Sequence, residues 1–176
     1  MNTSKNEPTP DEYRAFCASM YCAPDTVDRD LYVAFLLEEE TGEVAKLFAK
    51  AIRDNEHVVD HDKLKDELGD VLWCSSFDGK SSKVWPTFNI DGLPRHTRPV
   101  EPGDVFNRYG RSRRQWYYGH ILSLMQTVRH APSLDAAAAR LCAALGFEPA
   151  DVAAHNVAKL KDRKARNVIK GAGDGR

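Results

Sequence analysis

Apolar residues recur at spacings of three and four along much of this chain, which is the pattern of amphipathic helices. One such stretch begins after Ala23-Pro24-Asp25 and runs to about Asn55, with apolar positions at Leu36, Val44, Leu47, Ala51 and Ile52. A second begins near residue 60, where Asp60 or Asp62 can cap it, and continues through Leu64, Leu68, Val71 and Leu72. The pattern therefore predicts two long helices in the first half of the chain.

Local start signals predict further helices. Thr9-Pro10-Asp11-Glu12 combines an N-cap threonine, a proline at the first helical position and a glutamate that can close a capping box. We expect a helix from there to about Cys22. Helical pattern resumes later in three places: from about Arg114, over 134–145 behind a capping Ser133, and from Glu148-Pro149 towards Val168.

The segment from residue 75 to residue 113 has a different character. Serine, glycine, proline and isolated aromatic residues fill it, so it cannot form one helix, and a short hairpin is feasible around Asp91-Gly92. We therefore expect an all-α bundle of four to six helices, with residues 75–113 as an irregular insertion between the third and fourth. The length of 176 residues favours a single domain spanning 1–176.

Composition narrows the class of protein. The chain is 42% hydrophobic and 29% charged with a formal net charge of −1, which is typical of a globular domain. Residues 1–10 lack the apolar stretch of a signal peptide, and no run approaches the roughly 20 apolar residues of a membrane span. The four cysteines form no CxxC pair and no zinc-like spacing, so we expect reduced thiols and a cytoplasmic location.

Two pairs of carboxylates carry the candidate chemistry. Glu40 with Glu43, and Glu67 with Asp70, are each three residues apart, so each pair shares one helix face. Glu40 and Glu43 also lie on the stripe that carries Leu36 and Leu47, where a bundle favours apolar residues. Acidic groups at such positions need a compensating cation, and Mg²⁺ prefers oxygen ligands together with substrate phosphates. These pairs therefore predict a site for Mg²⁺ and a nucleotide pyrophosphate.

Two simpler interpretations compete with this one. A run such as Glu38-Glu39-Glu40 is, taken alone, more often a solvated helix face, although the second pair weakens that interpretation. A ferritin-like di-iron bundle also uses inward carboxylates, but it needs Glu-x-x-His on two helices, and no glutamate here has histidine three positions later. Iron is therefore disfavoured, and surface or packing roles are expected for the six scattered histidines.

The acidic pattern also matches a known signature. Glu39-Glu40-x-x-Glu43, followed by Glu67-x-x-Asp70, resembles the EExxE…ExxD motif of MazG-like all-α nucleoside triphosphate pyrophosphohydrolases. The stretch from Glu67 to Trp73 looks like the ELGDVLW sequence of that family. Asn156-Val157-Ala158-Lys159-Leu160 with Arg163 is similar to its NxxKL…R segment, and the tail from Lys170 to Arg176 resembles that of phage-type members.

This resemblance implies a MazG-like bundle that hydrolyses nucleoside triphosphates to monophosphate and pyrophosphate. The implied metal ligands for Mg²⁺, with Mn²⁺ able to substitute, are Glu40, Glu43, Glu67 and Asp70. Glu39 is implied as the catalytic, water-orienting group. The implied substrate-binding residues are Asn156, Lys159, Arg163, Trp73 and Lys170. A homodimer or homotetramer is implied as well, in the host cytoplasm if the chain is phage-encoded.

Two departures bear on the substrate. Cys74 stands where family members commonly carry an aromatic residue that can stack on the base. The insertion holds Trp85, Phe88, Arg95 and Arg98, which could form a lid or base pocket, although an oligomer contact or a plain loop is an equal alternative. A purine deoxynucleotide such as dGTP is our choice of substrate, with no residue that selects it.

Two functions without catalysis stay open at this stage. The chain could be a helical interaction module whose basic last helix meets an acidic partner. Nucleic-acid binding through Arg108–Arg114 and Lys159–Arg166 is a further alternative, which the near-neutral net charge disfavours.

Overall fold

The computed structural model describes residues 7–23, 26, 28–54, 59–77, 113–130 and 133–168. Within these ranges the protein consists of six α-helices and contains no strand, so the prediction of an all-α fold is confirmed. The helices are α1 (Pro10–Met20), α2 (Arg29–Arg53), α3 (His61–Ser75), α4 (Arg113–His130), α5 (Leu134–Ala144) and α6 (Pro149–Ala165).

Side-chain caps fix the starts of the first three helices. The predicted capping box forms at α1, where the Thr9 hydroxyl accepts from the Glu12 backbone and the Glu12 carboxylate accepts from the Thr9 N–H at 2.8 Å. Asp28 caps α2 through the backbone N–H groups of Asp30 and Leu31. Of the two aspartates proposed for α3, Asp60 is the cap.

Two expectations about helix ends differ from the structure in detail. Ser133 stands at the N-cap position of α5, but its hydroxyl donates to Asp135 Oδ1 at 2.7 Å and makes no bond to the helix backbone. The last helix was expected to run towards Val168, whereas α6 ends at Ala165. Asn167 adopts φ 58°, the left-handed conformation that ends many helices.

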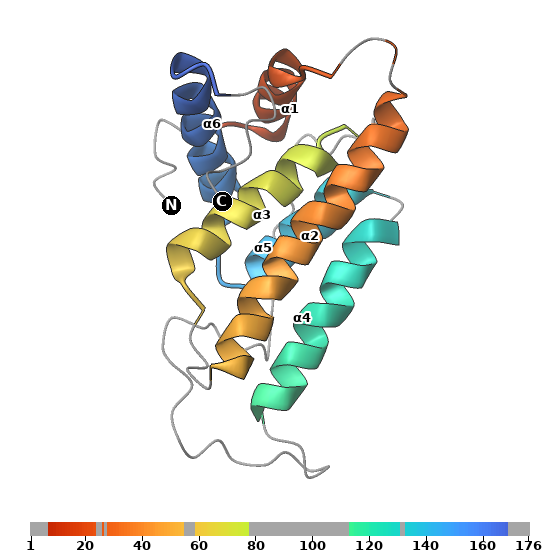
Figure 1. Ribbon diagram of the computed structural model, residues 1–176, viewed down its shortest axis with the longest axis vertical. Helices are drawn as coiled ribbons and strands as arrows, with labels where there is room; N and C mark the ends of the chain where they lie inside the picture. Colours follow the sequence, from red (N-terminus) through yellow and green to blue (C-terminus); the bar gives the residue numbers. More distant parts are fainter. Residues whose placement is uncertain are drawn as a thin grey trace.

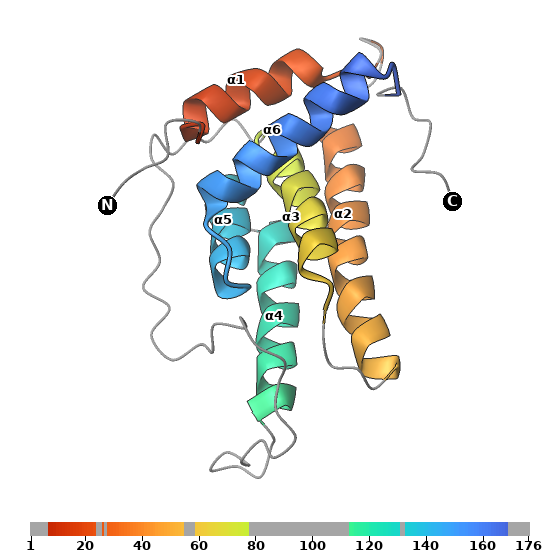
Figure 2. The same ribbon diagram turned by 90° about the vertical axis from the view of Figure 1, so that its left-hand side faces the viewer.

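The elements pack around α3 (Figures 1 and 2). Helices α2 and α3 run antiparallel side by side, and α4 lies along α2. Helices α1 and α6 lie next to each other across one end of the bundle, where α6 contacts α3 (Figure 2). The largest wholly buried apolar side chains come from several helices, among them Leu68 and Leu72 of α3, Ile121 of α4 and Leu141 of α5. Helix α3 contacts α2, α5 and α6. It therefore lies next to α2 and α6, the two other helices that carry predicted site residues.

The predicted insertion is described only at its two edges. Ser75 is the last residue of α3, and α4 begins at Arg113, one residue before its expected start. Residues 78–112 lie outside the described ranges, and with them the proposed hairpin around Asp91-Gly92 and the side chains of Trp85, Phe88, Arg95 and Arg98.

All four cysteines are free, and Cys17, Cys74 and Cys142 are buried. Among the helices in the described ranges, none combines the length and apolar character needed to cross a membrane.

Candidate functional site

Three of the predicted carboxylates meet between two antiparallel helices. Glu40 comes from the middle of α2, and Glu67 and Asp70 come from the middle of α3. One oxygen atom from each carboxylate lies within 4.8 Å of the other two, and all three side chains are partly buried. The antiparallel pairing of α2 and α3 thus brings Glu40 of the first predicted pair next to both members of the second.

The electrostatics of this cluster favour a bound cation. Burial, followed by the charges of Asp70 and Glu67, raises the pKa of Glu40 to about 8. Burial and the charge of Asp70 also raise the pKa of Glu67, while Lys159 partly offsets both shifts. Ionising all three half-buried acids near neutral pH is therefore unfavourable without a cation, and an all-oxygen donor set of this kind suits a hard divalent cation.

Glu43, the fourth predicted ligand, lies beside the cluster and outside its 4.8 Å group. Its two carboxylate oxygens accept from Lys46 Nζ at 2.9 and 3.2 Å, and 29% of its side chain is exposed. Its charge still contributes to the raised pKa of Glu67. Glu39 is exposed, and its charge helps to raise the pKa of Glu40. The predicted ligand role of Glu43 and catalytic role of Glu39 stay predictions.

Helix α6 supplies three of the predicted substrate-binding residues, and two of them contact Asp70. Asn156 Nδ2 donates to Asp70 Oδ1 at 3.1 Å, and Lys159 Nζ donates to Asp70 Oδ2 at 2.7 Å. Lys159 Nζ also donates to the carbonyl oxygen of Asp66 at 3.0 Å. Asn156 is wholly buried. Each oxygen of the Asp70 carboxylate is therefore held by a donor from α6.

The other predicted substrate-binding residues occupy different positions. Arg163 lies one helical turn beyond Lys159 on α6 and is half-buried. Trp73 lies on α3 and is half-buried, with its ring edge against Phe77 at a centroid distance of 4.8 Å. Its buried Nε1 atom has no hydrogen-bond partner among the described residues. Lys170 lies outside the described ranges.

Cys74 is 1% exposed and belongs to the core. Burial, followed by the charges of Glu40 and Asp70, raises its pKa, so the thiol lies close to these two acids. The side chain at this position is therefore enclosed in the core, one helical turn after Asp70.

Tyr13, which was not predicted from the sequence, connects α1 to the site. Its side chain is 1% exposed, and its hydroxyl donates to Asn156 Oδ1 at 2.9 Å and lies 3.3 Å from the carbonyl oxygen of Gly69. Burial raises the pKa of Tyr13 well above its ordinary value, so the phenol stays protonated and can donate. A tyrosine on the apolar face of a short helix looks like an ordinary core residue, so no sequence signal marked it.

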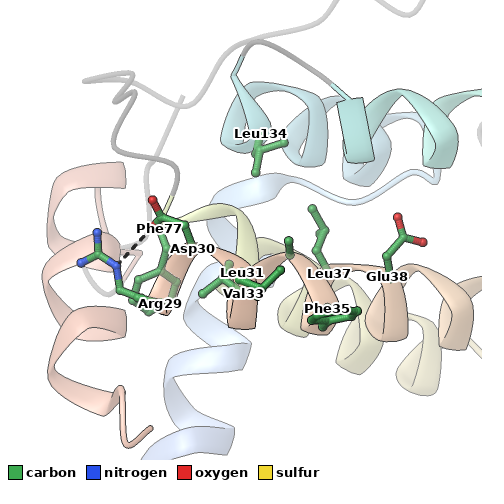
Figure 3. A pocket seen from close by; sticks show the side chains of 10 residues that line it. Arg29, Asp30, Leu31, Val33, Phe35, Leu37, Glu38, Phe77 and Leu134 are labelled. Atoms are coloured by element: carbon green, nitrogen blue, oxygen red, sulfur yellow. Dashed lines mark ion pairs between the residues drawn. The ribbon is translucent and has the colours of Figure 1, made fainter. Parts of the chain in front are cut away.

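An apolar groove lies apart from the carboxylate cluster (Figure 3). It has a volume of about 480 Å³ between the first half of α2, Phe77 and Leu134 of α5. Leu31 and Phe35, which line it, are 57% and 68% exposed. None of Glu40, Glu67 and Asp70 lines this groove, and it was not predicted from the sequence.

Comparison with known proteins locates the similarity on the two helices that carry the cluster. No curated protein and no solved structure matches the chain. The family model of the MazG nucleotide pyrophosphohydrolase domain, however, matches residues 30–93. The matched stretch contains nearly all of α2 and the whole of α3, whereas α1, α4, α5 and α6 lie outside it. Through residues 30–93, the chain thus carries a stretch similar to the MazG nucleotide pyrophosphohydrolase domain, with Glu40, Glu43, Glu67 and Asp70 inside it.

Proposed function

We propose that this protein is a Mg²⁺-dependent enzyme that hydrolyses nucleoside or deoxynucleoside triphosphates to the monophosphate and pyrophosphate. The observation that carries the proposal is the meeting of Glu40, Glu67 and Asp70 within 4.8 Å, inside the stretch that matches a nucleotide pyrophosphohydrolase domain. Three half-buried acids at this separation destabilise one another without a cation, whereas a triphosphate substrate arrives with divalent metal.

The proposed metal ligands are Glu40, Glu67 and Asp70, with Glu43 beside them, for Mg²⁺ or for Mn²⁺ in its place. When bound, the metal would neutralise the triphosphate and lower the pKa of a water molecule. Glu39, exposed next to Glu40, is the proposed group that orients the water.

Cationic and aromatic groups around the cluster are the proposed nucleotide contacts. Lys159 and Arg163 project from neighbouring turns of α6, and their positive charges suit the phosphate oxygens and the departing pyrophosphate. Trp73 lies one turn beyond Asp70 on α3, and Lys170 belongs to the same proposed set. The family resemblance also implies Asn156 as a nucleotide contact. Its amide, however, is hydrogen-bonded to Asp70 and Tyr13, which favours a role in holding the Asp70 carboxylate.

The resemblance to phage-type members extends the proposal to substrate, assembly and setting. We propose a purine deoxynucleotide such as dGTP as substrate and a homodimer or homotetramer as the assembly. The exposed Leu31 and Phe35 support an assembly, since a second copy would remove them from water. The proposed setting is the cytoplasm, host cytoplasm for a phage protein, where free thiols stay reduced.

A direct test incubates the protein with each common ribo- and deoxynucleoside triphosphate and Mg²⁺, and identifies the products by ion-exchange chromatography. We expect monophosphate and pyrophosphate from at least one of them, and none in the presence of a chelator. Glu40→Gln should lower kcat/KM by about 100-fold or more, because a ligand of the metal is lost. Glu38→Gln, a change of the same size on the same helix at an exposed residue outside the cluster, should retain activity. A folded protein that releases no monophosphate from any of these substrates would falsify the proposal.

The alternative is a non-catalytic helical module in which the basic end of α6 binds an acidic partner. Arg163 and Lys164 do lie in the last turn of α6. The module interpretation requires the carboxylates to face water, however, and Glu40, Glu67 and Asp70 are partly buried against one another. The enzyme is therefore the better-supported function, and product formation separates the two.

A further inference from the structure

A chain of hydrogen bonds crosses three helices and ends on the carboxylate cluster. It begins at the Tyr13 hydroxyl on α1, which donates to Asn156 Oδ1 on α6 at 2.9 Å. It continues from Asn156 Nδ2, which donates to Asp70 Oδ1 on α3 at 3.1 Å. Tyr13 and Asn156 are 1% and 0% exposed, so water does not replace the bond between them. Helix α1 thus reaches the site through a buried pair of polar groups.

The chemistry of the two groups gives this chain a direction. An amide side chain has a donor end and an acceptor end, and only its donor end can bind a carboxylate. With Nδ2 on Asp70, the Oδ1 atom points at Tyr13, whose protonated hydroxyl supplies the matching donor. A rotated amide would place Oδ1 against the Asp70 carboxylate, where two acceptors repel, and would leave the Tyr13 hydroxyl to accept from Nδ2 where it now donates to Oδ1. The Asp70 carboxylate therefore requires this orientation of Asn156, and the bond from the Tyr13 hydroxyl to Oδ1 holds the amide in it.

The surrounding backbone leaves the amide little room to move. A Cβ atom at Gly69 would lie 2.9 Å from Asn156 Nδ2 and 3.0 Å from Asn156 Cβ, so the amide rests directly against the α3 backbone. The Gly69 carbonyl oxygen is also 3.3 Å from the Tyr13 hydroxyl. Gly69 immediately precedes Asp70, and the amide is thus seated on the turn of α3 that presents this carboxylate.

We propose that Tyr13 is a positioning residue for the metal site, whose hydroxyl acts through the Asn156 amide to aim the Asp70 carboxylate at Glu40 and Glu67. The proposal rests on the proposed function, because it takes Asp70 as a metal ligand. Groups that hold a ligand from behind fix its orientation, and their loss typically weakens metal binding by about 10- to 100-fold. Tyr13 contributes this effect from a helix outside the stretch that matches the MazG domain.

The test measures Mn²⁺ binding to the metal-free protein by electron paramagnetic resonance, without nucleotide. Tyr13→Phe keeps the buried ring and removes only the hydroxyl, and we expect its Kd for Mn²⁺ to rise by about 10-fold or more. Tyr21→Phe is the matched control. The Tyr21 hydroxyl is also buried but has no hydrogen-bond partner among the described residues, so its removal should change the Kd by less than about twofold.

A double-mutant cycle tests whether the effect passes through Asn156. Asn156→Ala should weaken Mn²⁺ binding by itself, and adding Tyr13→Phe to it should cost little more, because the connection is already broken. If Tyr13 had a purely structural role, the effect of Tyr13→Phe on Mn²⁺ binding would instead add in full to that of Asn156→Ala. Gly69→Ala gives an independent perturbation, since it displaces the Asn156 amide without altering Tyr13, and it should also weaken Mn²⁺ binding.

The outcomes separate the two proposals. If the unaltered protein binds Mn²⁺ and Tyr13→Phe binds it equally well, or if the effects of Tyr13→Phe and Asn156→Ala simply add, the positioning role is wrong while the metal site stands. If the unaltered protein binds no Mn²⁺, the metal site fails and the positioning role fails with it. Circular dichroism of each variant confirms that it is folded, and Gly69→Ala decides the question should Tyr13→Phe unfold.

Discussion

At the scale of single residues, the environment of Glu40 links packing to chemistry. Its side chain is half-buried at the α2–α3 contact, and burial together with Asp70 and Glu67 raises its pKa to about 8. Without metal, this carboxyl group therefore holds its proton at neutral pH. A cation that binds here displaces the proton, so metal binding and pH are coupled at this residue.

The metal-free protein should accordingly lose stability as pH rises. The pKa of Glu40 is raised from 4.5 to about 8 in the folded protein, so the folded state keeps a proton that the unfolded chain releases between these values. The contribution of Glu40 to the free energy of unfolding should fall across this window, by at most roughly 1.4 kcal/mol per pH unit. Urea titrations in the presence of a chelator, between about pH 5 and pH 8.5, measure this slope.

Two substitutions test whether Glu40 causes this pH dependence of the free energy of unfolding. Glu40→Gln carries no titratable proton and should reduce the slope to the smaller part that the raised pKa of Glu67 contributes, whereas Glu38→Gln, at an exposed position two residues away, should leave it unchanged. A slope that survives in full in Glu40→Gln would show that another group binds the proton.

At the scale of helices, the site depends on the close contact of α3 and α6. Beyond the bonds to Asp70, Lys65 pairs with Asp151 at 2.7 Å and His155 contacts Asp66 Oδ1 at 2.8 Å. These pairs are partly exposed and each contributes little to stability. The absence of a side chain at Gly69 is what allows the helices to approach, because Asn156 fills the space that a Cβ would occupy.

Alanine substitutions at two glycines should therefore act in opposite directions. Gly69→Ala forces a methyl group to within 2.9 Å of the Asn156 side chain and should destabilise the fold by about 1–3 kcal/mol. Gly42→Ala, in the middle of α2, meets nothing within 4 Å and should stabilise the helix by roughly 0.5–1 kcal/mol. Urea unfolding of both variants checks the pair. Equal effects at the two positions would contradict the proposed role of Gly69 in the contact.

Local signals predicted the helices well, and contacts between distant residues explain what was missed. The Thr9 capping box, the Asp60 cap and the spacing of apolar residues depend on neighbours within a few positions, so the sequence reveals them. The convergence of Glu40 with Glu67 and Asp70 followed from two helical faces and is present in the structure. The bond between Tyr13 and Asn156 joins residues 143 positions apart, and helical periodicity cannot show which faces of α1 and α6 meet.

A second limit on prediction from the sequence is that one side chain can have several possible partners. Glu43 has the helical spacing of a metal ligand, and its two oxygens also accept from Lys46 on the next turn, so its ligand role stays a prediction. Ser133 has the residue type of a cap, yet its hydroxyl finds the Asp135 carboxylate. A pattern indicates what a residue is able to bind, whereas the outcome depends on which partner lies closest in three dimensions.

At the scale of the whole molecule, the candidate site lies where α2, α3 and α6 meet (Figure 2). The carboxylates come from the first two helices, and Lys159 and Arg163 come from the third. A metal–triphosphate complex that contacts all three helices would connect parts of the chain more than 100 positions apart. Such a ligand binds the folded form alone, so its binding must appear as added stability of the entire fold.

We therefore expect Mg²⁺ together with a triphosphate analogue that resists cleavage between the α- and β-phosphorus to raise Tm more than either ligand alone. At about 100 times the Kd, binding adds about 2.7 kcal/mol, which for a chain of this size corresponds to roughly 5–10 °C. Differential scanning calorimetry measures the shift. Glu40→Gln should abolish the joint effect and Glu38→Gln should preserve it, because only the first alters the cluster. A non-catalytic module with water-facing acids would give the same Tm with the analogue whether Mg²⁺ is present or absent, and that result would favour the module over the enzyme.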